Sequence, residues 1–234
     1  MTRRTVTVIL TLFLAVSAYP QKNELVERTF NWGFELGCGT TGMYMHKVGI
    51  GGYDASDNYS RQSGIGYMFS TFGRANMGKF YIQTGFSLFN DRTSISFPYR
   101  EPQSDMDMTG SFSVEGIYFQ VPLMVGFNIV KQHPYSFSVF AGPRFSTPWA
   151  SECKAYYSGF GNSRVSENLN RINFSLTAGV CCSISNVLMD FGFDYGLTKQ
   201  SDGTVSPGFY NPQQMPVIMD RCTGTLYFSI GLLL

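Results

Sequence analysis

Large apolar residues alternate with mostly small or polar ones along much of the chain, and the alternation is clearest between Glu115 and Ile129. Every second residue from Ile117 onward is large and apolar. A period of two predicts an extended strand with one apolar and one mixed face. This segment is longer than the roughly 5–6 residues usual in soluble sheets. Its length suits a tilted strand that crosses a membrane, which needs about 9–11 residues.

Seven further segments repeat this alternation, so the sequence predicts eight strands. They are 29–39, 63–72, 79–89, 115–129, 135–145, 171–183, 187–198 and 222–234. Connections of a few residues alternate with connections of about twenty or more. Transmembrane barrels have this asymmetry, with short periplasmic turns and long external loops. We therefore predict an all-β fold, an eight-stranded antiparallel up-and-down transmembrane β-barrel. Its last strand should pair with its first, because hydrocarbon leaves no backbone polar group unpaired.

The composition agrees with this prediction. Charged residues make up 14% of the 234-residue chain, against about 25% in soluble proteins, and there are 25 glycines and 16% aromatics. After the N-terminal segment, no run approaches the ~18 apolar residues of a membrane helix. Apolar surface is instead spread one residue in two over many strands, as in a barrel. There is no basic patch, which argues against nucleic acid as a partner.

The N-terminus has the layout of a secretory signal. Arg3 and Arg4 precede an apolar core, and a small-residue cleavage site follows at 16–18. We predict a signal peptide over 1–18, a short periplasmic lead over 19–28 and a barrel domain over 29–234. The expected location is the cell outer membrane.

Four ionisable residues fall on the inward faces of the predicted strands, namely Glu35, Arg144, Asp190 and Asp194. An eight-stranded barrel is just wide enough for side chains to fill it, and buried charges there must pair. We predict a polar network that plugs the lumen, with Arg144 held by Glu35 or Asp194. A proton or ion path through the same residues is the alternative.

Pro122 lies inside the central strand, where proline removes a ladder hydrogen bond. We expect a β-bulge at this position. The odd-numbered face of the strand should meet lipid and the even-numbered face the lumen.

Histidines and cysteines offer little chemistry. Catalysis of the Ser/His/carboxylate type needs a histidine beside a serine, but His46 falls in a long predicted loop and His133 in a short turn. Neither has metal-ligand partners at useful spacing. We expect no catalytic site, no metal and no cofactor. Cys153 and Cys222 lie in or beside external loops and could form a disulfide in an oxidising envelope.

The residues Tyr118, Gln120 and Pro122, followed by Gly142-Pro143, resemble a family of outer-membrane β-barrel proteins of Bacteroidetes-type bacteria that includes PorT-like proteins. The resemblance implies an exported eight-stranded barrel and a link to secretion. The chain departs from many barrels by ending in leucines, at 232–234, where an aromatic residue is common.

Three hypotheses follow for the function. The first is a non-enzymatic outer-membrane barrel with a filled lumen, whose loops bind a ligand or partner. Its expected partners are outer-membrane lipid and envelope or secretion-system proteins. The second is an outer-membrane lipid-modifying enzyme with a rim His/Ser site. The third is a soluble lipocalin-like carrier, which shares the alternation but turns its apolar face inward.

Overall fold

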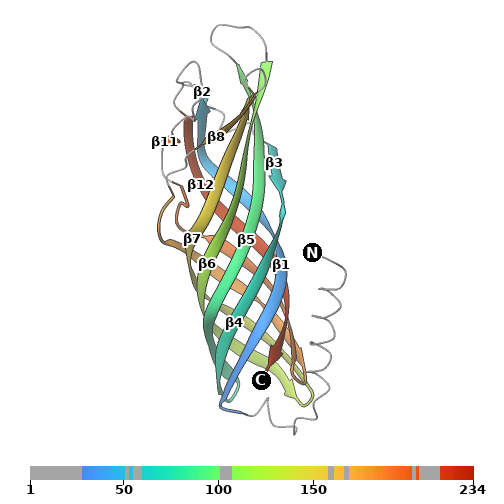
Figure 1. The fold of residues 1–234 in the computed structure, drawn as a ribbon. Coiled ribbons are helices and arrows are strands. Elements are labelled where there is room, and N and C mark those ends of the chain that lie inside the picture. Colours follow the sequence, from blue (N-terminus) through green and yellow to red (C-terminus); the bar gives the residue numbers. More distant parts are fainter. Residues whose placement is uncertain are drawn as a thin grey trace.

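The computed structural model describes residues 28–50, 53–54, 60–100, 107–157, 161–165, 169–201, 204–205 and 217–234. Long antiparallel strands run through most of this chain and form the wall of a tall barrel (Figure 1). The eight long strands are β1 (Phe30–Ile50), β4 (Ile65–Met77), β5 (Phe80–Arg100), β6 (Asp107–Gln132), β7 (Tyr135–Tyr157), β9 (Asn173–Ile184), β10 (Val187–Gly196) and β12 (Val217–Leu233). Four short strands add to them: β2 (Tyr53–Asp54), β3 (Ser60–Ser63), β8 (Gly161–Val165) and β11 (Thr204–Val205).

The sheet closes on itself between its first and last long strands. The long strands follow the order β12-β10-β9-β7-β6-β5-β4-β1, and β1 pairs back onto β12 from Gly33↔Leu233 to Ile50↔Val217. Closure removes both sheet edges, so every strand of the wall has two partners. The predicted eight-stranded closed barrel is confirmed. Within the described residues no helix is long and apolar enough to cross a membrane. The predicted signal peptide lies outside these residues.

Tight turns join the strands at one end of the barrel, which we call the turn end. They are Gly78–Lys79, His133–Pro134 and Ser185–Asn186. Gly78 and Ser185 have positive φ values of 63° and 54°, as tight hairpin turns often require. The turn at Ser185–Asn186 lies where the sequence predicts it. The predicted turn over 73–78 is too long, because β4 continues to Met77.

At the opposite end the strands run well past their predicted limits. β5 continues to Arg100 and β6 begins at Asp107, so most of the predicted loop over 90–110 is a hairpin. We call this part of the wall the extension; it comprises 41–50, 91–100, 107–116, 151–157 and 217–223. Part of its interior is an apolar core, formed by the buried Met43, Ile95, Phe97, Phe112, Val114 and Cys153, and the polar Thr41, Asp91, Thr93, Asp220 and Arg221 are buried beside it. This core explains why β5 and β6 continue, since both bury alternate apolar side chains there.

The bulge predicted at Pro122 is wrong. The bulges between β6 and β7 lie at Ile117/Tyr118 and Asn128/Val130. Pro122 pairs with Arg144, and its carbonyl oxygen accepts a hydrogen bond of 2.9 Å from Thr84 Oγ1. The ladder to β5 resumes beyond Pro122 in the same register. Proline therefore removes a donor here without adding a residue to the strand.

The predicted faces of the central strand are confirmed. On its odd-numbered face Ile117, Leu123, Val125, Phe127 and Ile129 are exposed on the outer wall. On its even-numbered face Tyr118, Met124, Gly126 and Asn128 are buried in the barrel.

Candidate functional site

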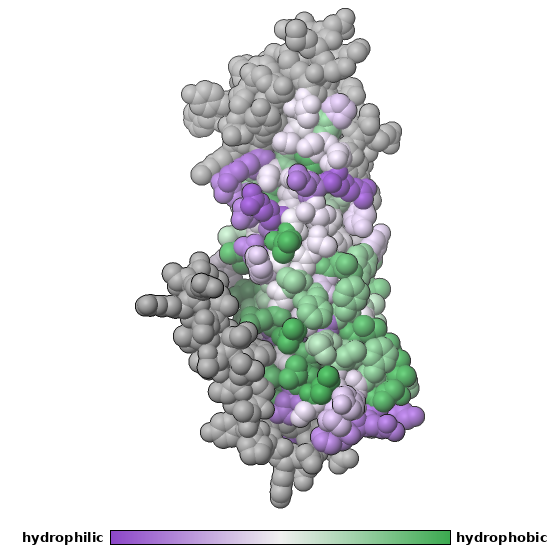
Figure 2. All heavy atoms as spheres, turned by 90° about the vertical axis from the view of Figure 1, so that its right-hand side faces the viewer, coloured by the Kyte–Doolittle hydropathy of each residue, from purple (hydrophilic) through white to green (hydrophobic). Residues whose placement is uncertain are grey.

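The outer wall carries a continuous apolar belt between two polar bands (Figure 2). Near the turn end the belt begins at Phe30, Met77 and Phe80, beside the exposed Arg28 and Lys79. Toward the extension it ends at exposed residues of three neighbouring strands, Ile65, Leu88 and Ile117. Such a belt is the lipid-facing surface of a membrane barrel. A lipocalin-like carrier would bury this face, so the geometry contradicts that hypothesis.

Arg144 lies at the centre of the lumen inside this belt. Its Nη1 is 2.5 Å from Asp194 Oδ2, and both side chains are buried. Thr177 Oγ1 donates a hydrogen bond of 2.5 Å to the other Asp194 oxygen. Arg144 also donates hydrogen bonds of 3.3 Å to Gln120 Oε1 and to the Tyr227 hydroxyl. Of its two predicted partners, Arg144 is therefore paired with Asp194 and not with Glu35.

A glycine on a neighbouring strand makes room for this arrangement. Tyr227 packs against Arg144, whose guanidinium carbon is 5.0 Å from the centre of the ring. A Cβ atom on Gly192 would lie 2.5 Å from the Tyr227 hydroxyl oxygen. Any larger residue at Gly192 would displace the ring that holds Arg144.

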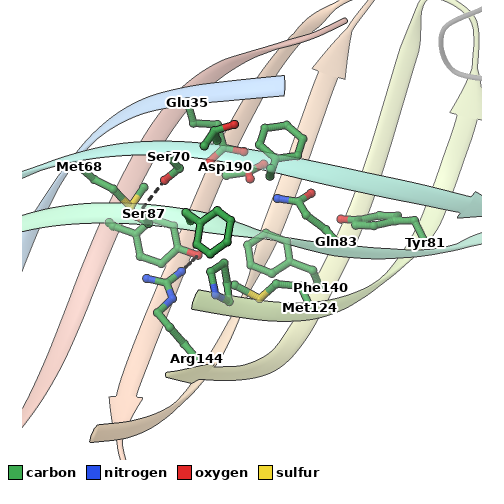
Figure 3. Close-up of a pocket in the computed structure, with 15 residues that line it drawn as sticks. Glu35, Met68, Ser70, Tyr81, Gln83, Ser87, Met124, Phe140, Arg144 and Asp190 are labelled. Carbon is green, nitrogen blue, oxygen red and sulfur yellow. Dashed lines mark hydrogen bonds between the residues drawn. The ribbon is translucent and has the colours of Figure 1, made fainter. Parts of the chain in front are cut away.

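Glu35 and Asp190 form a second polar group, nearer the turn end. They lie side by side in Figure 3, and Ser229 Oγ donates a hydrogen bond of 3.3 Å to Glu35 Oε2. Arg74 is close enough to act electrostatically on both carboxyl groups. It also donates hydrogen bonds of 2.9 and 2.7 Å to Gln83 Oε1. All four predicted lumen residues are thus buried, but they belong to two groups.

Two further buried arginines were missed by the sequence reasoning. Arg74 falls in the segment predicted as a turn, and Arg221 in a predicted loop. Arg221 is fully buried, donates a hydrogen bond of 3.0 Å to Gln200 Oε1 and acts electrostatically on Asp91. Correct strand ends would have placed both arginines on inward-facing positions. The lumen therefore holds three arginines in succession along its length, each near a carboxyl group.

Small cavities lie between these side chains. One, of about 30 Å³, is lined by Glu35, Asp190 and Arg144, among others (Figure 3). The other, also of about 30 Å³, is lined by Asp91, Asn173 and Asp194. Each is large enough for only about two water molecules. The Arg144–Asp194 ion pair lies between them, since Arg144 lines the first and Asp194 the second.

The histidines and cysteines form no reactive site among the described side chains. His133 lies in an exposed turn, and the side chain of His46 is outside the described residues. Cys153 and Cys222 are buried on β7 and β12, which are not neighbours in the sheet, and their disulfide stays a prediction. Cys222 Sγ donates a hydrogen bond of 3.6 Å to the Thr198 carbonyl, and partial burial raises the pKa of its thiol. No three acidic, histidine or cysteine side chains in this part of the chain could hold a metal.

Comparison with known proteins agrees with the belt and the closed sheet. A family model described as "Outer membrane protein beta-barrel domain" matches residues 19–202. The chain belongs to this family. It is an integral outer-membrane β-barrel. No functionally curated protein matches it.

Several solved outer-membrane proteins are also similar to the chain. Neisserial surface protein A is 13% identical, with 86% of this chain and 96% of that chain covered and a TM-score of 0.37. Ail of Yersinia pestis is 15% identical, with 88% and 100% covered and a TM-score of 0.38. The translocator domain of the autotransporter NalP from Neisseria meningitidis is 12% identical, with 98% and 95% covered and a TM-score of 0.36.

Proposed function

We infer that this barrel is a non-enzymatic binding protein of the outer membrane, with a closed lumen and its binding surface on the extension. The Arg144–Asp194 ion pair carries the inference, because it separates two cavities that each hold only about two waters. A diffusion pore needs a continuous aqueous path, and a buried ion pair between two such small cavities argues against one. Activity must then lie on the outside of the barrel.

The extension is the part of the wall suited to binding. Its outward side chains on β5 and β6 include Arg92, Ser94, Ser96, Ser111 and Ser113, which form a polar sheet surface beyond the belt. Among the described residues, the connections at the turn end are short hairpins. Because barrels of this kind keep short turns in the periplasm, we place the extension outside the cell.

Partners of the extension are proposed to be envelope proteins. The resemblance to PorT-like proteins favours a secretion-related one, and no residue of the described site identifies it. A lipid-modifying enzyme is the weaker proposal, since such chemistry needs a histidine beside a serine and an acid. His133, the histidine whose side chain is described, lies at the turn end and contacts no such pair.

Site-specific photo-crosslinking in intact cells tests the proposal. A crosslinker at Ser111, on the extension, should give a discrete protein adduct. The same crosslinker at Gln132, an exposed residue at the turn end, should not give that adduct. A membrane-impermeant maleimide should label Ser111→Cys and leave Gln132→Cys unlabelled. Equal labelling at the two ends, or an adduct at Gln132 alone, would contradict the proposed surface.

A further inference from the structure

A cleft of about 220 Å³ lies just beyond the apolar belt, where β3 replaces β4 as the neighbour of β5. Ile65 is the residue of β4 farthest from the turn end, and beyond it β3 pairs with β5. Gly64 makes the junction, and its N–H donates a hydrogen bond of 2.9 Å to the Arg92 carbonyl. A Cβ atom at Gly64 would lie 2.2 Å from that oxygen, so only glycine lets the strands approach so closely. The cleft is lined by Gln62, Ser63, Gly64, Arg92, Thr93, Ser94 and Ser113.

The lining of the cleft combines hydroxyl groups, one amide and one guanidinium. Ser94 Oγ donates a hydrogen bond of 3.4 Å to Gln62 Oε1, which leaves the Gln62 amide nitrogen available. Arg92 is exposed and forms no ion pair with any described residue. Glu115 lies opposite Arg92 in the β5–β6 ladder but does not line the cleft. The lining therefore suits an anionic ligand that also carries hydroxyl groups.

The height of the cleft relative to the belt restricts what can reach it. Leu88 and Ile65 are the last apolar side chains of the belt on β5 and β4. Arg92 is four residues beyond Leu88, about 10 Å higher along a tilted strand. The polar headgroup layer spans roughly 5–7 Å on each side of the hydrocarbon, so the long Arg92 side chain can reach it. A second cation, Arg61, lies beside the cleft with its guanidinium carbon 4.9 Å from the centre of the Tyr44 ring.

We propose that this cleft binds the phosphorylated sugar headgroup of the outer-leaflet glycolipid, with phosphate on Arg92 and sugar hydroxyls on Ser94, Ser113 and Gln62. Arginine binds phosphate through two parallel N–H groups, which a solvated ammonium group cannot match. The acyl chains of the same lipid would lie along Ile65, Leu88 and Ile117. The identity of the lipid rests on the proposed orientation of the barrel, because the extension must face the outer leaflet.

Native mass spectrometry of the full-length protein in detergent tests the site. The probe lipids are a diphosphorylated acylated glucosamine disaccharide, its dephosphorylated form and phosphatidylglycerol. The wild type should retain the phosphorylated glycolipid best. Losing one charge-assisted phosphate contact should lower the retained fraction about tenfold in Arg92→Gln. Ser113→Tyr, which fills the cleft without changing charge, should have the same effect, whereas Arg171→Gln, an exposed arginine just before β9 and away from the cleft, should have none.

Each other outcome overturns the proposal. Equal retention by wild type and both cleft variants, each shown to be folded by its heat-modifiable mobility, would exclude the cleft as the site. Equal binding of the dephosphorylated lipid would exclude phosphate recognition. An Arg92-dependent preference for phosphatidylglycerol would exclude the sugar headgroup. The maleimide labelling at Ser111 and Gln132 reports the orientation separately, so a failure of the site and a failure of the orientation are distinguishable.

Discussion

The barrel contains two halves that follow the same backbone alternation but present different side chains to their surroundings. In the membrane half, β5 points Ile82, Phe86 and Leu88 outward and the polar Ser87 inward. In the extension, the same strand points Arg92 outward and Ile95 and Phe97 inward. The side-chain period does not change at Asn90; only the surroundings of the wall change, from lipid to water. The outer face therefore changes from apolar to polar while the strand continues, and an alternating pattern alone does not say which face is inside.

A large effect is expected inside the membrane half. Arg144→Met leaves Asp194 buried without its ion-pair partner, and the free energy of unfolding should fall by about 3–5 kcal/mol. Urea titration of protein folded in lipid vesicles measures this change. Arg144→Met combined with Asp194→Leu should recover most of the loss, because no uncompensated charge remains. A double variant as unstable as the single one would show that the interior of this half does not depend on charge pairing.

The apolar core of the extension should respond to loss of volume. Phe112 is fully buried, and its ring centre is 5.4 Å from that of Phe97. Phe112→Ala should cost about 3–5 kcal/mol, because it leaves a cavity in an apolar core. Urea titration in vesicles gives the value, and Phe86→Ala on the lipid face should cost less. Equal losses would mean that the extension has no packed core of its own.

An arginine placed on the outer wall should destabilise the membrane half more than the extension. Leu123 lies near the middle of the belt, and Leu123→Arg should cost about 2–4 kcal/mol. Ser96→Arg places the same side chain on the extension and should change stability by about 0.5 kcal/mol or less. The comparison needs only the heat-modifiable band pattern and urea midpoints of the two variants. Similar midpoints would place the membrane boundary elsewhere.

The smallest effect concerns an ion pair on the extension. Lys154 Nζ lies 3.5 Å from Glu152 Oε2, and both side chains are largely exposed. Lys154→Ala should change the unfolding free energy by only about 0–1 kcal/mol, since water screens such pairs. Repeating the urea titration at high salt should leave even this difference unresolved. A loss comparable to that of Arg144→Met would show that water does not surround this surface.

Much of the fold could be predicted because alternation is a local property. The eight strands, their inward and outward faces and the turn at Ser185–Asn186 all follow from short stretches of sequence. The strand ends could not be found in the same way. Beyond Asn90 the apolar residues move to the other face, and the pattern of Ile95 and Phe97 between polar residues reads as an irregular loop.

The sequence predicts which charged residues face the lumen, but it does not predict which of them form an ion pair. The alternation along each strand is enough to place Glu35, Arg144, Asp190 and Asp194 on the inward face. Which carboxylate meets Arg144 depends on the heights of β7 and β10, which lie on either side of β9. That relation comes from the register of two ladders and is not visible in any single segment. Arg74 was missed for the simpler reason that β4 is longer than its alternation suggests.

Electrical recording across a planar bilayer tests most directly whether the Arg144–Asp194 pair closes the lumen. The wild-type barrel should show no sustained conductance steps. Arg144→Ser combined with Asp194→Ser joins the two cavities, and adding Phe112→Ala thins the apolar core of the extension that fills the lumen beyond them, so this triple variant should produce small, steady steps in protein that still folds. A wild-type barrel that conducts steadily, with steps unchanged in the triple variant, would contradict a lumen closed by these side chains.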